Sequence, residues 1–228
     1  MKNYGIILAS GTGSRFGADI PKQFIKICGK TVLEWCVDAF EQAEGIDKII
    51  VVITPEYKER AEQILSDKYK KIEKIVSGGA ERKDSSLIGI SCINEKEAYV
   101  YIHDCARPLV SQNIINDCIK CMETNDACTV AIPSNDTVYI TKENVVESIP
   151  ERKTIMRAQT PQCFKLSLIK KAHELSKNDT NFTDDCGLII KNNLCSMKIV
   201  NGSEENIKIT YQDDIYFAEQ ILKSRGKF

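Results

Sequence analysis

Residues 9–17, which read Ala-Ser-Gly-Thr-Gly-Ser-Arg-Phe-Gly, form a glycine-rich segment directly after a short apolar run. Because glycines lack side chains, backbone N–H groups in such a segment can approach an anion closely, which favours a phosphate-binding loop. Arg15 lies within the segment and Lys22 follows shortly after it. A triphosphate needs cations of this kind beside it. The glycines alone are also typical of a tight turn, and they match neither the dinucleotide fingerprint nor the Walker P-loop.

Asp104 is a second residue whose position suggests chemistry, because it directly follows the apolar residues 100–103. A carboxylate at the end of a buried strand is costly unless it meets a cation, and Mg²⁺ held together with substrate phosphates is a common solution. The position therefore favours a ligand for Mg²⁺ or another divalent cation. The alternatives are that Asp104 caps the next turn or pairs with Arg107.

The first half of the chain alternates short β-branched runs with amphipathic stretches, which is the pattern of βαβ units and a mainly parallel sheet. We expect a Rossmann-like, doubly wound α/β fold in which helices flank the sheet. Ligands of such sheets bind at the carboxyl ends of the strands, so the loops that follow these strands should converge on one site. The expected strands are residues 5–9, 48–53, 74–77 and 98–103, and the expected helices are 32–42, 56–65 and 84–93.

The pattern changes after a predicted helix at 114–124 and a strand at 127–132. Residues 136–157 contain short strand-like pieces between polar turns and no stretch of helical length, which predicts a projecting β-arm. The remaining chain predicts a helix at 166–175, a strand at 195–200 and a terminal helix at 213–224. We expect one domain, residues 1–228, that carries this arm.

Composition excludes several classes of function. The chain has 228 residues, a net charge of -1 and a pI near 6.2, so no electrostatic footprint for nucleic acid is present. Its apolar runs are too short to span a membrane, and its first residues do not form a signal-peptide core. We therefore expect a cytoplasmic protein. The ten cysteines are then free thiols, with Cys118 and Cys121 in ordinary buried positions on a helix.

Five ordered motifs, which together span nearly the whole chain, resemble the 2-C-methyl-D-erythritol 4-phosphate cytidylyltransferase family, which includes the ribitol 5-phosphate cytidylyltransferases. The first is Leu-Ala-Ser-Gly-Thr-Gly-Ser-Arg-Phe-Gly followed by Pro-Lys-Gln-Phe. The others are Gly-Gly-Ala-Glu-Arg-Lys-Asp-Ser at 78–85, His-Asp-Cys-Ala-Arg-Pro at 103–108, Thr-Pro-Gln-Cys-Phe at 160–164, and Asn-Ile-Lys-Ile-Thr at 206–210. The resemblance implies transfer of CMP from CTP to the phosphate of a small linear polyol phosphate, with release of pyrophosphate.

The resemblance also implies a role for each matched residue. Arg15, Lys22 and Lys208 would stabilise the transferring phosphate, and Asp104 would ligate the metal. The residues implied to bind the nucleotide are Ala9, Ser10, Gly11, Thr12, Gly13, Gly79, Ala80, Arg82 and Ser85. Those implied to bind the acceptor are Arg107, Thr137, Arg152 and Thr160, of which Thr137 and Arg152 would come from the arm of the partner in a homodimer with exchanged arms.

The two histidines are not expected to act in catalysis. The acceptor phosphate is already ionised near neutral pH and needs no general base, so positioning and charge neutralisation suffice. We therefore interpret His103 as a packed residue at a strand end, and we expect His173 to face solvent from a polar helix.

The acceptor implied by the resemblance depends on small departures from the family pattern. Residues 138–140, Val-Tyr-Ile, are more like the ribitol-phosphate branch, and Ala80 replaces a common acidic residue. Residues 106–109, the Ala-Gln before Thr160, and residues 183–185 are more like the methylerythritol branch. We favour 2-C-methyl-D-erythritol 4-phosphate, for non-mevalonate isoprenoid biosynthesis. The alternative is D-ribitol 5-phosphate, which would give CDP-ribitol for cell-wall or capsule polymers.

Other classes fit the residues less well. A non-catalytic nucleotide sensor would have little reason to keep Arg15, Lys22, Asp104 and Lys208 together. A nucleotide-sugar pyrophosphorylase would carry a different base-reading segment. A dinucleotide-dependent oxidoreductase would need a third glycine in its loop and an acidic residue after the second strand.

Overall fold

The computed structural model describes residues 1–11, 16, 20–180 and 182–226. Its centre is a seven-stranded sheet with the order β11-β7-β10-β6-β1-β4-β5. The strands are β1 (Lys2–Ala9), β4 (Lys48–Ile53), β5 (Ile72–Ser77), β6 (Ala98–Asp104), β7 (Ala127–Pro133), β10 (Met156–Lys165) and β11 (Lys198–Asn201). Six strands pair in parallel, whereas β10 runs antiparallel between β6 and β7.

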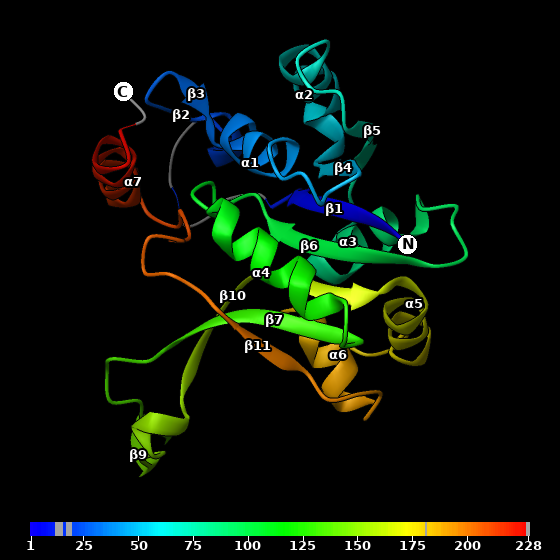
Figure 1. Cartoon of the computed structure of the whole chain (residues 1–228). Helices are drawn as coiled ribbons and strands as arrows, with labels where there is room; N and C mark the ends of the chain where they lie inside the picture. The colour runs from blue at the N-terminus through cyan, green and yellow to red at the C-terminus, as the bar shows by residue number, and fades with distance from the viewer. Residues whose placement is uncertain (12–15, 17–19, 181, 227–228) are drawn as a thin grey trace.

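The side chains of β1 show why its neighbours form three layers. From Tyr4 onward the whole strand is buried, and alternate residues point to opposite faces: Ile7 and Ala9 enter one core, whereas Ile6 and Leu8 enter the other. One core is covered by α1 (Val32–Glu41), α2 (Lys58–Leu65), α4 (Gln112–Met122) and α7 (Asp213–Ser224). The other is covered by α3 (Arg82–Ser91), α5 (Leu166–Leu175) and α6 (Asp185–Lys191). Helices thus lie on both faces of the sheet (Figure 1).

Local signals fix the starts of the helices beside the carboxyl ends of the strands. Thr31 caps α1 in a capping box with Glu34, and Glu81 and Asp84 form a similar pair at α3. A short antiparallel pair, β2 (Lys26–Ile27) and β3 (Lys30–Thr31), leads into α1. Short 3₁₀ turns lie at Lys22–Phe24, Pro55–Tyr57 and Arg152–Thr154.

The arm links β7 to β10. Its strands β8 (Ile140–Lys142) and β9 (Val145–Ser148) pair antiparallel across a turn at Glu143 and Asn144, both with positive φ, as a tight hairpin turn requires. The hairpin projects away from the central sheet (Figure 1). It exposes a row of large apolar side chains: Val138, Tyr139, Ile140, Val145, Val146 and Ile149.

The expected α/β fold is confirmed, with differences in the second half. The strand expected at 195–200 is the shorter β11, and the first strand-like piece of the arm is β8 instead of 137–141. Helix α6 and the antiparallel strand β10 were not expected. Within the described part of the chain, no helix is both long and apolar enough to cross a bilayer.

Candidate functional site

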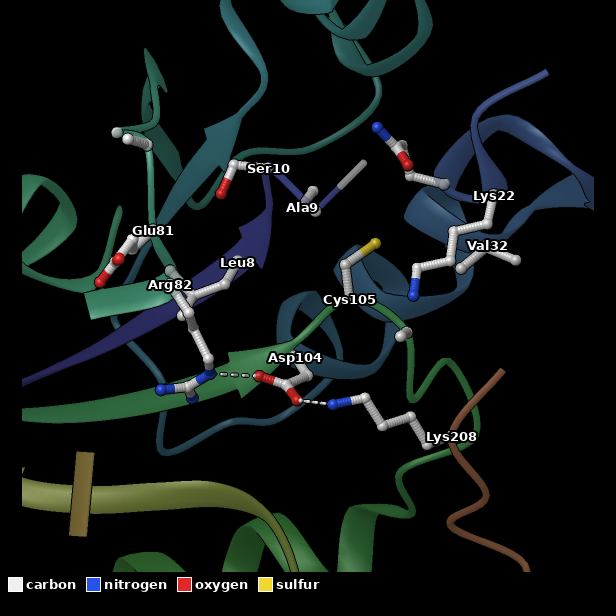
Figure 2. Close-up of a pocket in the computed structure, with 15 residues that line it drawn as sticks. Leu8, Ala9, Ser10, Lys22, Val32, Glu81, Arg82, Asp104, Cys105 and Lys208 are labelled. Carbon is white, nitrogen blue, oxygen red and sulfur yellow. Dashed lines mark hydrogen bonds and ion pairs between the residues drawn. The ribbon is translucent and has the colours of Figure 1, made fainter. Parts of the chain in front are cut away.

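A cleft of about 270 Å³ opens at the carboxyl ends of β1 and β6, close to the lower end of the size range of small-molecule sites. It combines residues from four of the five sequence motifs (Figure 2). The predicted site residues that line it are Ala9, Ser10, Gly11, Lys22, Gly79, Ala80, Arg82, Asp104 and Lys208. The convergence expected from the strand pattern is therefore confirmed.

The turn at 78–79 forms one wall of the cleft and is held by hydroxyl groups. The Ser85 hydroxyl accepts the backbone N–H of Gly79 at 3.1 Å and the hydroxyl of Ser10 at 2.7 Å. Any side chain at Gly78 would meet Ser10 at 2.6 Å, and one at Gly79 would meet Asp84 at 2.4 Å. Both glycines are required by these close approaches, which give the turn a fixed shape.

Asp104 lies between two cations of the cleft. One carboxylate oxygen accepts Nε of Arg82 at 3.1 Å, and the other accepts Nζ of Lys208 at 2.8 Å (Figure 2). Burial opposes ionisation of this carboxyl most strongly, but the charges of Arg82 and Lys208 outweigh it and hold the pKa of Asp104 well below its usual range. The carboxylate is ionised at neutral pH. The alternative that it pairs with the Arg107 side chain is wrong, because its ion-pair partners are Arg82 and Lys208.

A second carboxylate, that of Asp185, binds another nitrogen of the Arg82 guanidinium. Asp185 is 1% exposed, and its Oδ2 accepts Nη1 of Arg82 at 2.7 Å. Its other oxygen accepts the Ser86 hydroxyl at 2.5 Å, and its backbone N–H donates to Gln162 at 3.0 Å. Burial opposes the charge of Asp185, yet Arg82 and these hydrogen bonds lower its pKa overall. The guanidinium thus has a defined position between two acidic groups.

His173 contributes to this buried group and does not face solvent, so that expectation was wrong. It is 4% exposed, and its Nε2 lies 3.7 Å from Asp185. The reason is the packing of α5 against α6, a helix that the sequence pattern did not reveal. Asp185 itself belongs to residues 183–185, which were noted only as a family resemblance. No role was assigned to it.

His103 is a packed residue at the end of β6, as expected. It is completely buried, and its two ring nitrogens contact the Arg107 carbonyl and the Thr160 hydroxyl, both at 2.9 Å. Burial lowers the pKa of His103 to about 4, so the ring is neutral near pH 7. Thr160 also accepts the backbone N–H of Asp104 at 3.2 Å. These two side chains hold the end of β6, which carries Asp104.

The predicted acceptor-binding residues, Thr160 included, lie outside the cleft of this single chain. Arg107 donates to the backbone carbonyls of Asn206 at 2.7 Å and Ala158 at 3.1 Å, and so braces the segment that carries Lys208. Thr137 and Arg152 are exposed on the arm. Their proposed contact with an acceptor remains a prediction. Thr12, Gly13 and Arg15 lie outside the described residues.

Sequence reasoning missed part of the cleft wall. Lys22, Arg82 and Lys208 line the wall as predicted, but their neighbours were not assigned. Cys105 and Ala106 lie inside the motif at 103–108, and Glu81 lies inside the motif at 78–85. These motifs therefore already indicated residues of the cleft wall. The lining residues without an assigned role are Leu8, Gln23, Val32, Glu81, Cys105 and Ala106. Among the described lining residues, Lys22, Arg82 and Lys208 are basic and Asp104 and Glu81 are acidic, a combination that suits a nucleoside triphosphate with a divalent ion.

Comparisons with known proteins agree with this geometry. The family model of 2-C-methyl-D-erythritol 4-phosphate cytidylyltransferase matches residues 4–224. The chain is 39% identical to the enzyme of that name from Lachnospira eligens, over 97% of this chain and 99% of the relative. It is 40% identical to a bifunctional ribulose 5-phosphate reductase/CDP-ribitol pyrophosphorylase from Haemophilus influenzae, over this whole chain but only 49% of the relative. This chain thus spans about half of that longer protein.

Solved structures show the same fold. The 4-diphosphocytidyl-2C-methyl-D-erythritol synthase of Anaerococcus prevotii superimposes with a TM-score of 0.87 at 30% identity, over 97% of this chain and 96% of that one. The 2-C-methyl-D-erythritol 4-phosphate cytidylyltransferase of Francisella tularensis gives a TM-score of 0.82 at 30% identity, over 96% and 99% of the two chains.

Proposed function

Because the chain belongs to the 2-C-methyl-D-erythritol 4-phosphate cytidylyltransferase family, we propose that it transfers CMP from CTP to 2-C-methyl-D-erythritol 4-phosphate and releases pyrophosphate. The observation that carries the proposal is the cleft beside the turn at 78–79, which Lys22 lines and in which Arg82 and Lys208 pair with the ionised Asp104. Relatives that differ in acceptor share this nucleotidyl transfer. The acceptor is the finer part of the proposal.

The side chains of the cleft suit in-line attack of one phosphate on another. An acceptor phosphate is already a nucleophile at neutral pH, so the protein has to align the two phosphates and offset their repulsion. Lys22 and Lys208 both line the cleft and lie on one side of Asp104, opposite Arg82 (Figure 2). With its nitrogens occupied and its pKa lowered to about 4, His103 is unsuited to act as a base.

Asp104 also fits a divalent cation. A buried carboxylate that stays ionised at the mouth of a phosphate site is the donor that Mg²⁺ uses together with substrate phosphates and water. Mg²⁺ or another divalent ion held there would neutralise charge on the triphosphate. Lys208 has a side chain 41% exposed, so it can turn from Asp104 toward a phosphate, whereas Arg82 stays tied to Asp185.

The fixed turn at 78–79 would read the base. Its backbone groups keep one arrangement because Ser85 holds both Gly79 and Ser10, so they match a single pattern of donors and acceptors on a base edge. A base with the wrong edge leaves buried polar groups unpaired, which lowers its turnover strongly. We therefore expect CTP to be strongly preferred over UTP, ATP and GTP.

A homodimer with exchanged arms would complete the acceptor site. The arm exposes apolar residues that its two short strands cannot cover by themselves, including Tyr139 and Val145. In a partner's site, Arg152 would bind phosphate through paired N–H donors and Thr137 through its hydroxyl. We propose that the protein acts in the cytoplasm, where its ten cysteines would stay reduced.

One observation favours a second acceptor, D-ribitol 5-phosphate. The Haemophilus relative, named for CDP-ribitol synthesis, matches this entire chain at 40% identity. The arm segment Val138-Tyr139-Ile140 is also more like the ribitol-phosphate branch. This segment directly follows Thr137, so it would lie next to the acceptor in a dimer. The cleft residues discussed above fit both acceptors equally.

A panel assay tests the proposal. The purified protein is mixed with CTP, Mg²⁺ and either 2-C-methyl-D-erythritol 4-phosphate or D-ribitol 5-phosphate, and pyrophosphate release is followed at several acceptor concentrations. We expect the larger kcat/KM with the first acceptor. A larger value with the second assigns the protein to CDP-ribitol synthesis. Release from neither acceptor overturns both assignments, and the Lys22→Ala variant controls for contaminating activity.

A further inference from the structure

Three cysteines from distant parts of the sequence meet in the core, away from the nucleotide cleft. Cys128 on β7 lies directly opposite Cys163 on the adjacent strand β10, so the two side chains point to the same face of the sheet. Cys118 covers them from helix α4. The three sulfur atoms lie within 4.8 Å of one another, and all three residues are 0% exposed.

These thiols differ from an ordinary core cysteine in their surroundings. Cys36 is equally buried, but its sulfur donates to the Cys105 carbonyl at 3.0 Å, which is a usual way to satisfy a core thiol. In the cluster the sulfurs face one another. Hydrogen bonds from Cys128 and Cys163 lower the pKa of Cys118, while burial raises that of Cys163. The cluster thus concentrates soft ligands and favours the loss of a first proton.

Charge determines which kind of ion or element the three sulfur atoms can bind. The strongest influences on the Cys118 thiol are other thiols and the carboxylate of Asp117, whereas the cation of Lys198 acts on the half-buried Cys121. A divalent ion with three thiolates has a net charge of minus one, which is costly in an apolar core. A trivalent thiophilic element with three thiolates is neutral. Its complex needs no counterion.

We propose that Cys118, Cys128 and Cys163 form a three-sulfur site for trivalent arsenic or a chemically equivalent trivalent metalloid. In the binding step arsenous acid exchanges its three hydroxyl groups for three sulfurs. Three arsenic–oxygen bonds break, three arsenic–sulfur bonds form, and the thiol protons leave with the hydroxyl groups as three water molecules. No oxidant or reductant takes part, and the complex formed is uncharged.

Cys121 provides a route into the site. It lies one helical turn after Cys118, is half-buried, and interacts with Cys128. A metalloid that first meets Cys121 at the surface can pass to the buried sulfurs by exchange of one ligand at a time. The final complex links α4 to β7 and β10, so it would stabilise the fold against unfolding by mass action.

The test uses sodium arsenite with the full-length, reduced protein. We expect one arsenic per chain by mass spectrometry, three sulfur neighbours by X-ray absorption, and a higher Tm. Cys118→Ala, Cys128→Ala and Cys163→Ala should each lose the one-to-one complex. Cys36→Ala, the burial-matched control, should keep it. Cys121→Ala should also keep it but form it several-fold more slowly.

Several results would overturn the proposal. The site is refuted if the wild type binds no arsenic, or if any of the three cluster variants keeps the full complex. Tighter binding of zinc than of arsenite at these sulfurs refutes the charge argument. The sulfur count is measured on the unmodified protein, so it decides the matter even if a variant folds poorly. None of these readouts depends on the acceptor or on nucleotidyl transfer.

Discussion

Arg82 and Lys208 hold the same carboxylate from opposite sides of the cleft, but they are supported very differently. Arg82 is 24% exposed and is tied to the buried Asp185, whose carboxylate also accepts the Ser86 hydroxyl and whose backbone N–H donates to Gln162 on β10. Lys208 is 41% exposed and extends from a segment without regular secondary structure. The comparison teaches that one side of the site is a preformed scaffold, whereas the other side can adjust to a substrate.

Loss of the adjustable cation should have the largest effect on turnover. Lys208→Ala removes a charge aimed at the transferring phosphate, so we expect kcat to fall about a hundredfold or more, equivalent to roughly 3 kcal/mol. Steady-state pyrophosphate release measures this. Folding should be almost normal, because Asp104 keeps its ion pair with Arg82 when the partly exposed Lys208 is removed. Lys198→Ala, an exposed lysine on β11, is the control and should keep wild-type turnover.

Loss of the ion pair between Asp185 and Arg82 should instead lower the free energy of unfolding. Asp185→Asn leaves the Arg82 guanidinium with one acidic partner in a buried setting, which costs about 3 kcal/mol in the free energy of unfolding. Urea titration at neutral pH measures it. The matched control is Asp179→Asn, because Asp179 pairs with Lys191 at the surface, where we expect a change below about 0.5 kcal/mol. Equal effects of the two variants would remove the distinction between scaffold and surface.

Lowering the pH should reveal the contribution of Asp185 to the stability of the fold. The folded-state pKa of Asp185 is lowered, so its contribution to stability is present above its unfolded value and is lost as pH falls through the folded value. Wild-type stability should therefore fall more steeply below about pH 4 than that of Asp185→Asn. Unfolding free energies measured across that range give the two slopes. Parallel curves would contradict the role of Asp185 as an ionised partner.

The arm extends the comparison to the partner subunit. If Arg152 acts in the neighbour's site, then Arg152→Ala mixed with Lys22→Ala forms heterodimers in which one site carries both lesions and the other carries neither. We expect activity above that of either variant alone, up to about half the wild-type level per heterodimer. Acceptor-dependent pyrophosphate release after co-expression measures it. No recovery in proven heterodimers places Arg152 in its own chain's site or outside any site.

The smallest effect on turnover is expected for substitution of His103. Its pKa is lowered to about 4 by burial, so the unfolded chain binds a proton that the folded chain does not between that value and about 6.5. Stability should consequently rise with pH across that window. His103→Gln should flatten the slope while it leaves the pH profile of kcat unchanged. A changed kcat profile would revive a proton-transfer role for the ring.

The elements that the sequence predicted well are those with strong local signals. The strands around Ile6, Ile50 and Ile102 are continuous apolar runs, and motifs lie at the ends of β1, β5 and β6, so both the fold and the cleft could be predicted. The antiparallel course of β10 could not, because a strand's direction depends on which neighbours it pairs with. Helix α6 spans only seven residues, too short for a clear helical period.

The same reason explains what was missed near the site. Asp185 meets Arg82 across a separation of 103 residues, and no local pattern announces such a contact. His173 was expected at the surface because its helix is polar, but the face that carries it is covered by α6. The sulfur cluster likewise depends on the register between β7 and β10. A single sequence contains these residues without indicating their distances.

The way in which the arm joins the sheet has a consequence for how the family can diversify. The arm leaves at the end of β7 and returns at the start of β10, two neighbouring antiparallel strands whose backbones are about 4.8 Å apart. A hairpin with such closely spaced ends can be lengthened, shortened or exchanged without moving any strand of the sheet. Evolution can therefore vary the arm as a module while the nucleotide cleft, built from the other loops, remains under separate selection.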